Sequence, residues 1–144
     1  MSNDTNKPKR RVLLIDDEPG MVKLVSRKLE MIGFEVVTAA DGQDGLTKAR
    51  LGRPDVIVLD LVLPKLSGLE VCAALKQDPQ YQHIPIIICT GMGQAMDEKL
   101  CRECGANAYI NKSHDTSALV EQIEALLGTI LPDEPSGSGP PGAA

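Results

Sequence analysis

Aromatic side chains are scarce in this chain of 144 residues, which contains one Phe, two Tyr and no Trp. The core must therefore be aliphatic, and a surface on which nucleic-acid bases stack is not expected. Basic residues are also in the minority: 15 Lys and Arg face 20 Asp and Glu, a formal net charge of -5. This charge argues against broad nucleic-acid binding, which depends on neutralising many phosphates.

The one dense group of basic residues lies near the N-terminus, at Lys7, Lys9, Arg10 and Arg11. Four charges are few for a nucleic-acid site, so we interpret them as part of a solvated tail. Long apolar runs are missing too: no stretch is as long as a membrane span, and the N-terminus has no signal-peptide core. We expect a cytoplasmic protein that is not inserted in a membrane, with its four cysteines reduced.

Short apolar segments alternate with segments of helical periodicity along the chain. Strands are predicted at 11–15, 34–39, 55–59, 85–90 and 107–111, and helices at 19–32, 42–51, 67–77, 94–104 and 116–131. Five alternations imply parallel strands with right-handed helical crossovers, and strands that are apolar on both faces imply helices on both sides. We expect one α/β domain over residues 10–131, with a flexible tail at 1–9 and a disordered Pro, Gly and Ser-rich tail at 132–144.

Polar residues stand at the carboxyl ends of four of the predicted strands. Asp16 and Asp17 follow the first strand, Asp60 follows the third, Thr90 ends the fourth and Lys112 follows the fifth. Ligands of parallel α/β sheets bind beyond the carboxyl ends of the strands, so these side chains are expected to meet at one edge. Clustered carboxylates raise each other's pKa values, and Mg²⁺, which prefers oxygen ligands, relieves their repulsion.

Asp60 ends the apolar segment "VIVLD", where an unpaired charge would be costly. A metal ion and Lys112 would share that charge, and the same arrangement suits phosphoryl transfer. The Asp60 carboxylate can act as a nucleophile toward phosphorus, the metal and Lys112 can stabilise phosphoryl oxygens, and Thr90 can bind one of them. Each residue taken alone has a commoner role as a cap, turn former or surface group, and their conjunction favours the site.

The segments "LLIDDEP", "VIVLDLVLPKLSG", "PIIICTG" and "GANAYINK" resemble the response-regulator receiver domains of two-component signalling, from Arg11 to about Leu131. The resemblance implies a flavodoxin-like, doubly wound (βα)5 fold with a five-stranded parallel sheet in the order 2-1-3-4-5. It implies that Asp60 accepts a phosphoryl group from a sensor histidine kinase or a histidine phosphotransfer protein. Asp17, Asp60 and the Val62 backbone carbonyl would bind Mg²⁺ directly, and Asp16 through water.

The resemblance also assigns a switch. Lys112 would pair with the phosphoryl group, Thr90 would move toward it, and Tyr109 would repack as the aromatic switch residue. This would remodel the surface of the fourth helix, fifth strand and fifth helix, so that a downstream protein target binds the phosphorylated form. We expect a stand-alone receiver, because no output domain fits after Leu131.

Four positions near the predicted site differ from the family pattern or bear on the lifetime of the phosphate. The lysine is followed by Ser113 instead of a proline in a cis peptide, so we expect a trans bond with a shifted loop or a strained cis bond. Gly91 stands where alanine usually follows the threonine, which predicts a freer loop. Val62 and Met92 flank the phosphorylation site and are apolar, so neither can orient an attacking water. We therefore expect a long-lived aspartyl phosphate.

The cysteines are interpreted as packing residues and not as metal ligands. Cys72 and Cys89 are expected in the core, and Cys101 and Cys104 are interpreted as small buried residues, since a zinc site needs two more ligands.

A phosphatase with an aspartate nucleophile would require an acid at Val62. A flavin or nucleotide module would require a phosphate-binding loop where "IDDEPG" places acids. A phosphorylation-independent adaptor ranks below the receiver, and no independent enzymatic turnover is expected.

Overall fold

The computed structural model describes residues 9–91, 99, 102–112 and 116–128. Within them, five parallel strands form one sheet in the order β2-β1-β3-β4-β5, which confirms the expected flavodoxin-like topology. The strands are β1 (Arg11–Ile15), β2 (Glu35–Ala39), β3 (Val56–Leu59), β4 (Ile86–Thr90) and β5 (Ala108–Asn111). The helices are α1 (Pro19–Ile32), α2 (Gly42–Gly52), α3 (Gly68–Lys76) and α5 (Ser117–Leu127). Most of the helix predicted at 94–104 lies outside the described residues.

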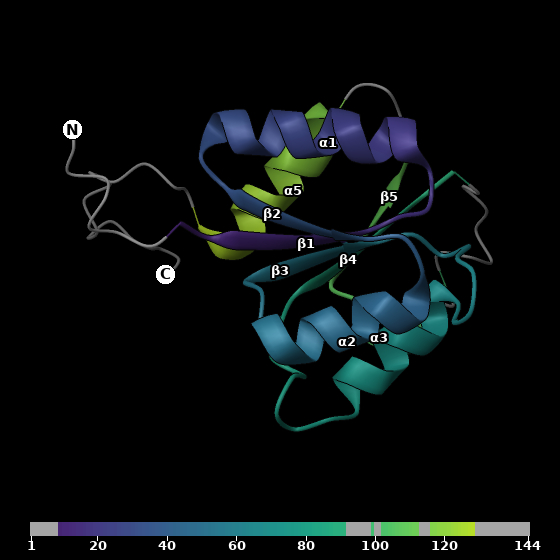
Figure 1. Ribbon diagram of the computed structural model, residues 1–144. Coiled ribbons are helices and arrows are strands. Elements are labelled where there is room, and N and C mark those ends of the chain that lie inside the picture. The colour runs from purple at the N-terminus through teal and green to yellow at the C-terminus, as the bar shows by residue number, and fades with distance from the viewer. Residues whose placement is uncertain (1–8, 92–98, 100–101, 113–115, 129–144) are drawn as a thin grey trace.

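Helices cover both faces of the sheet, with α1 and α5 on one side and α2 and α3 on the other (Figure 1). Successive strand residues point to opposite faces, so each strand contributes to two separate cores. The α2/α3-side core consists of Leu13, Ile15, Ala39, Leu46, Ala49, Ile57, Leu59, Leu61, Val71, Cys72, Leu75, Ile84, Ile86 and Ile88. The α1/α5-side core consists of Val12, Leu14, Val25, Leu29, Phe34, Val56, Val58, Ile87, Cys89, Leu119 and Ile123. This arrangement explains why the central strands read as continuous apolar runs.

Local signals set the ends of the helices. Pro19 occupies the first turn of α1, and Gly33 ends that helix with a φ of 118°, a conformation that favours glycine. At the start of α3 the Ser67 hydroxyl accepts a hydrogen bond from the Glu70 amide at 3.2 Å, and the Glu70 carboxylate accepts one from the Ser67 amide at 2.9 Å. This capping box satisfies backbone donors that the helix itself cannot pair.

The structure differs from the sequence prediction at the edges of the sheet and in the last helix. β2 and β5 are edge strands and are only partly buried, whereas β1, β3 and β4 are buried almost throughout. Helix α5 begins at Ser117 and ends at Leu127, before Gly128, and buries Leu119 and Ile123. Residues 129–131 of the predicted helix lie outside the described residues. Within the described part of the chain, no helix has the length and apolar character to cross a membrane.

Candidate functional site

Backbone hydrogen bonds bring the predicted site residues to one edge of the sheet. The Asp16 amide donates to Ala39 O at 3.0 Å and the Asp60 amide donates to Ile15 O at 3.0 Å. The Lys112 amide donates to Thr90 O at 2.7 Å. Each residue thus continues the hydrogen bonding of its strand by one step, so its side chain is held by the sheet.

Three carboxylates meet at this edge, as the sequence predicted. Asp16, Asp17 and Asp60 each offer one oxygen, and these oxygens lie within 4.8 Å of one another. Asp16 is 5% exposed and Asp60 6% exposed, whereas Asp17 faces solvent. A set of carboxylate oxygens open to water on one side is the donor set that Mg²⁺ uses, so these residues fit a hard divalent cation.

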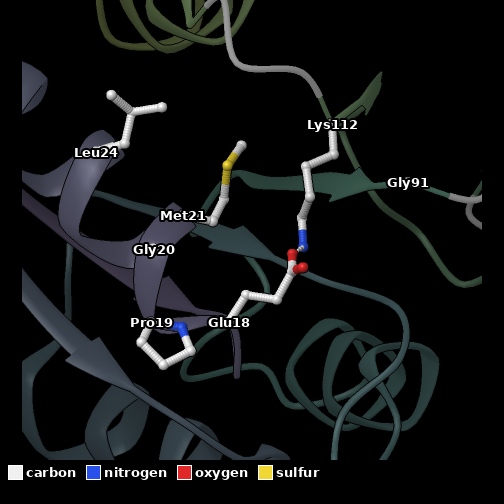
Figure 2. Close-up of a pocket in the computed structure, with 7 residues that line it drawn as sticks. All are labelled: Glu18, Pro19, Gly20, Met21, Leu24, Gly91 and Lys112. Atoms are coloured by element: carbon white, nitrogen blue, oxygen red, sulfur yellow. Dashed lines mark hydrogen bonds and ion pairs between the residues drawn. The ribbon is translucent and has the colours of Figure 1, made fainter.

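Lys112 carries the positive charge of the site. Its Nζ lies 2.9 Å from Asp60 Oδ2, 3.1 Å from Asp16 Oδ2 and 2.6 Å from Glu18 Oε1. Figure 2 shows the lysine side chain reaching from the end of β5 toward Glu18 at the start of α1. Burial alone would lower the pKa of Lys112, but the hydrogen bonds that its ammonium donates to the three carboxylates outweigh burial and raise that pKa. The ammonium is therefore charged at every physiological pH.

Backbone amides hold the other oxygens of the two buried carboxylates. Asp16 Oδ1 accepts a hydrogen bond from the Glu18 amide at 2.9 Å, and Asp60 Oδ1 accepts a longer one from the Val62 amide at 3.4 Å. The pKa of Asp16 is raised, in the expected direction, but burial is the main cause and the charge of Asp60 is a small one. Desolvation at the strand end therefore matters more than repulsion between the carboxylates.

Two hollows open at the site and share Glu18, Gly91 and Lys112. The smaller, of about 350 Å³, is further lined by Asp17, Asp60, Val62 and Thr90. The larger, of about 570 Å³, is further lined by Pro19, Gly20, Met21 and Leu24 (Figure 2). Charged and hydroxyl side chains, Asp60 among them, line the first hollow, while the second presents the side chains of Met21 and Leu24 beside the ion pair. A hollow lined by charged groups and one that includes apolar side chains thus adjoin at the site.

Glycine at position 68 lets α3 begin directly beside Asp60. A Cβ atom at Gly68 would lie 2.1 Å from the Asp60 carbonyl oxygen and 2.8 Å from Leu61 Cα. The Gly68 amide donates to Leu61 O at 2.9 Å, which closes the loop after β3. The backbone that carries the Asp60 side chain is therefore packed against the first turn of α3.

The remaining predicted residues surround this centre. Thr90 is 1% exposed at the end of β4 and lines the smaller hollow, and Val62 is 61% exposed beside it. Tyr109 is half-buried on β5, in register with Ile88, and packs against the α2/α3-side core. Met92 and Ser113, two of the departures from the family pattern, lie outside the described residues, and so does the Lys112–Ser113 bond.

Sequence reasoning assigned no role to Glu18, although its carboxylate forms the shortest ion pair of Lys112. The available signal was its position, directly after the two aspartates and before the proline that starts α1. That position places a third acid of the same segment within reach of the fifth strand end.

Comparisons with known proteins agree with this geometry. The response regulator receiver domain family matches residues 12–124. The DNA-binding dual master transcriptional regulator RpaA of Synechocystis sp. is 40% identical over 117 residues, 81% of this chain and 48% of that protein. The polar-differentiation response regulator DivK of Brucella anthropi is 36% identical over 119 residues, 83% of this chain and 97% of that protein. The chain thus spans about half the length of the first relative and nearly all of the second.

Solved structures give the same result. The Vibrio cholerae chemotaxis protein CheY4 superposes with a TM-score of 0.77 at 30% identity, over 83% of this chain and 99% of that chain. The strand order, the acidic cluster and the match over residues 12–124 all agree. The chain therefore belongs to the response regulator receiver domains of two-component systems.

Proposed function

We propose that Asp60 accepts a phosphoryl group from the phosphohistidine of a sensor histidine kinase or a histidine phosphotransfer protein. The observation that carries the proposal is the position of Asp60, a buried carboxylate bonded to Lys112 that lines a hollow of about 350 Å³. Carboxylates are rarely buried unless they are paired, and here the partner is Lys112. The hollow gives an incoming phosphoryl group access to this one.

The reaction is a direct transfer between two side chains. An Asp60 carboxylate oxygen attacks phosphorus, the bond between phosphorus and the donor's histidine nitrogen breaks, and its electron pair returns to that nitrogen. Lys112, 2.9 Å from Asp60 Oδ2, offsets negative charge on the phosphoryl oxygens. The Thr90 hydroxyl at the rim of the same hollow binds one of those oxygens in the product.

Asp16, Asp17, Asp60 and the Val62 backbone carbonyl are the residues that would hold Mg²⁺. When bound, the cation neutralises charge on the phosphoryl oxygens during transfer. The ammonium of Lys112 pairs with the carboxylates of Asp16, Glu18 and Asp60, and Asp17 adds a further negative charge beside two of them. We therefore expect phosphorylation to require the cation.

Phosphorylation is proposed to act through partner binding. Thr90 moves toward the phosphoryl group and Tyr109 repacks, which changes the surface around β5 and α5 and favours a downstream protein target. We propose a cytoplasmic location, with no contact to nucleic acid by this domain. Whether the target is a separate protein or a segment of the same polypeptide does not change this mechanism.

The test is the mass of the intact protein after incubation with acetyl phosphate and Mg²⁺. We expect a gain of one phosphoryl group that disappears with a chelator and in Asp60→Asn. The matched control is Asp55→Asn, which replaces an acid just before the opposite end of the same strand and should still be phosphorylated. No gain in the wild type, even with kinases present, would support the phosphorylation-independent adaptor instead.

The lifetime of the phosphorylated form tests the role of Val62. Its side chain is apolar and 61% exposed at the rim of the hollow, so it cannot hydrogen-bond a water that attacks phosphorus. We expect the phosphate to decay over minutes or longer after the phosphodonor is removed. Decay within seconds would show that another group orients the water.

A further inference from the structure

Two cysteines lie together on the α2/α3 side of the sheet, away from the acidic site. Cys72 is in α3 and fully buried, and Cys104, which precedes β5, is partly exposed and packs against the α2/α3-side core. Cys72 Sγ donates a hydrogen bond to the Cys104 carbonyl oxygen at 3.6 Å, and the Cys72 side chain also lies close enough to act on the Cys104 thiol. Residues 32 positions apart in the chain are thus held side by side.

A lysine stands beside this pair. Lys76 lies one turn after Cys72 in α3, and its aliphatic stem covers Gly105, where a Cβ atom would lie 3.0 Å from Lys76 Cγ. Its Nζ donates to Gln82 O at 3.1 Å and to Ile84 O at 2.9 Å. Hydrogen bonds to the loop before β4 therefore anchor the ammonium, and its charge acts on both thiols.

This environment favours the thiolate of Cys104. The hydrogen bond from Cys72 lowers the pKa of Cys104 most, burial opposes it, and the Ala106 amide and the charge of Lys76 lower it further, to about 7. Cys89 in the α1/α5-side core shows the contrary case, since burial raises its pKa to about 11. Thiolates are the reactive form of cysteine, so the two sites differ strongly in reactivity.

We propose that Cys72 and Cys104 form an oxidisable dithiol, which a hydroperoxide converts into an intramolecular disulfide. The partly exposed Cys104 thiolate attacks the O–O bond, and the sulfenic acid forms as hydroxide or alkoxide leaves and takes up a proton. The buried Cys72 sulfur then loses its proton and attacks the sulfenic sulfur, with release of water. Two thiols are oxidised by two electrons and the peroxide is reduced to water and water or alcohol.

The bridge would connect α3 to the segment that leads into β5. Strand β5 carries Tyr109, and Lys112 directly follows its last residue. The disulfide therefore restrains the segment that precedes β5 and the proposed switch residues. This consequence rests on the proposed function. The oxidation itself goes beyond that function and needs neither Mg²⁺ nor phosphate.

The sequence makes the test sharp, because trypsin places all four cysteines in different peptides. Cys72 falls in 66–76, Cys89 in 77–99, Cys101 in 100–102 and Cys104 in 103–112. The full chain is treated with hydrogen peroxide near pH 7, alkylated, digested and mapped by mass spectrometry. We expect the loss of two hydrogens and a linked pair of peptides 66–76 and 103–112, which dithiothreitol separates.

Variants separate this pair from its neighbours without relying on one fold-sensitive substitution. Cys104→Ser is expected to abolish the linked pair, and Cys101→Ser and Cys89→Ser to leave it unchanged. In the reduced wild type, alkylation of Cys104 near pH 7 is expected to be about 100-fold faster than that of Cys89. A linked pair of peptides 100–102 and 103–112, a disulfide between two chains, or oxidation of Cys104 without any bridge would each overturn the proposal. Phosphorylation by acetyl phosphate is measured on the same samples, so a failure of either proposal is seen separately.

Discussion

Removing the charge of Lys112 gives the most direct test of the site's electrostatics. In Lys112→Met, the side chains of Asp16 and Asp60, only 6% and 7% exposed, lose the ammonium that lies 3.1 and 2.9 Å away. Breaking a buried ion pair by removing one partner costs about 3–5 kcal/mol. The lysine side chain is itself 13% exposed and Asp17 opens the site to water, so we expect about 3 kcal/mol.

The free energy of unfolding is measured by urea denaturation near pH 7 without divalent cations. A loss of about 3 kcal/mol lowers the thermal midpoint of a domain of this size by about 10 °C. The matched control is Lys65→Met, whose lysine is 67% exposed and lies 3.7 Å from Asp41. Exposed ion pairs contribute little, so the control should lose less than about 1 kcal/mol.

The way in which the stability loss of Lys112→Met changes with pH tests its electrostatic origin. The pKa of Asp16 is raised in the folded protein mainly by burial, while the hydrogen bond from Lys112 lowers it in part. Without the lysine this pKa rises further, so protonation stabilises the folded variant at pH values where the unfolded chain is still ionised. The stability deficit should therefore be largest near neutral pH and shrink as the pH falls through the folded pKa. A deficit equal to that of Lys65→Met, or one independent of pH, would refute the electrostatic account.

Other predictions concern packing, capping and thiol reactivity. Gly68→Ala places a Cβ 2.1 Å from the Asp60 carbonyl oxygen and should lower the free energy of unfolding, measured by urea denaturation, by about 2–4 kcal/mol. The control Gly20→Ala, where the added Cβ has open space around it, should not lower it. Ser67→Ala removes the capping box of α3 and should cost about 1 kcal/mol, measured in the same assay. The rate of Cys104 alkylation, followed by peptide mapping, should rise with a midpoint near pH 7; a midpoint near pH 9 would contradict the proposed influence of its neighbours.

Local signals explain why most of the fold was predictable from the sequence. The bounds of β1 and α1 match the prediction, because an apolar run meets two acids and a proline at one end and Gly33 closes the helix. The expectation that polar residues at the carboxyl ends of the strands lie close together is also correct for Asp16, Asp17 and Asp60. Burial of Cys72 and Cys89 in the two cores is likewise confirmed.

Features that depend on distances between elements were not predictable. The ion pair between Glu18 and Lys112 requires the loop after β1 to meet the end of β5, which no local pattern reports. The exposure of β2 and β5 follows from their place at the sheet edges, and their composition alone suggested full burial. In α5 the choice of Leu119 over Val120 as a buried residue depends on the angle at which the helix meets the sheet.

The close packing around Gly68 leaves little space on the α3 side of the site. On the α3 side, the backbone after Asp60 touches the first turn of the helix and has no room to yield. Just after β4, a Cβ atom at Gly91 would meet no atom of the described residues within 4 Å. A phosphoryl group on Asp60, as proposed, would therefore meet closely packed backbone toward α3 and more open space toward Gly91. We expect any displacement to be toward the end of β4, which pairs with β5 in the sheet.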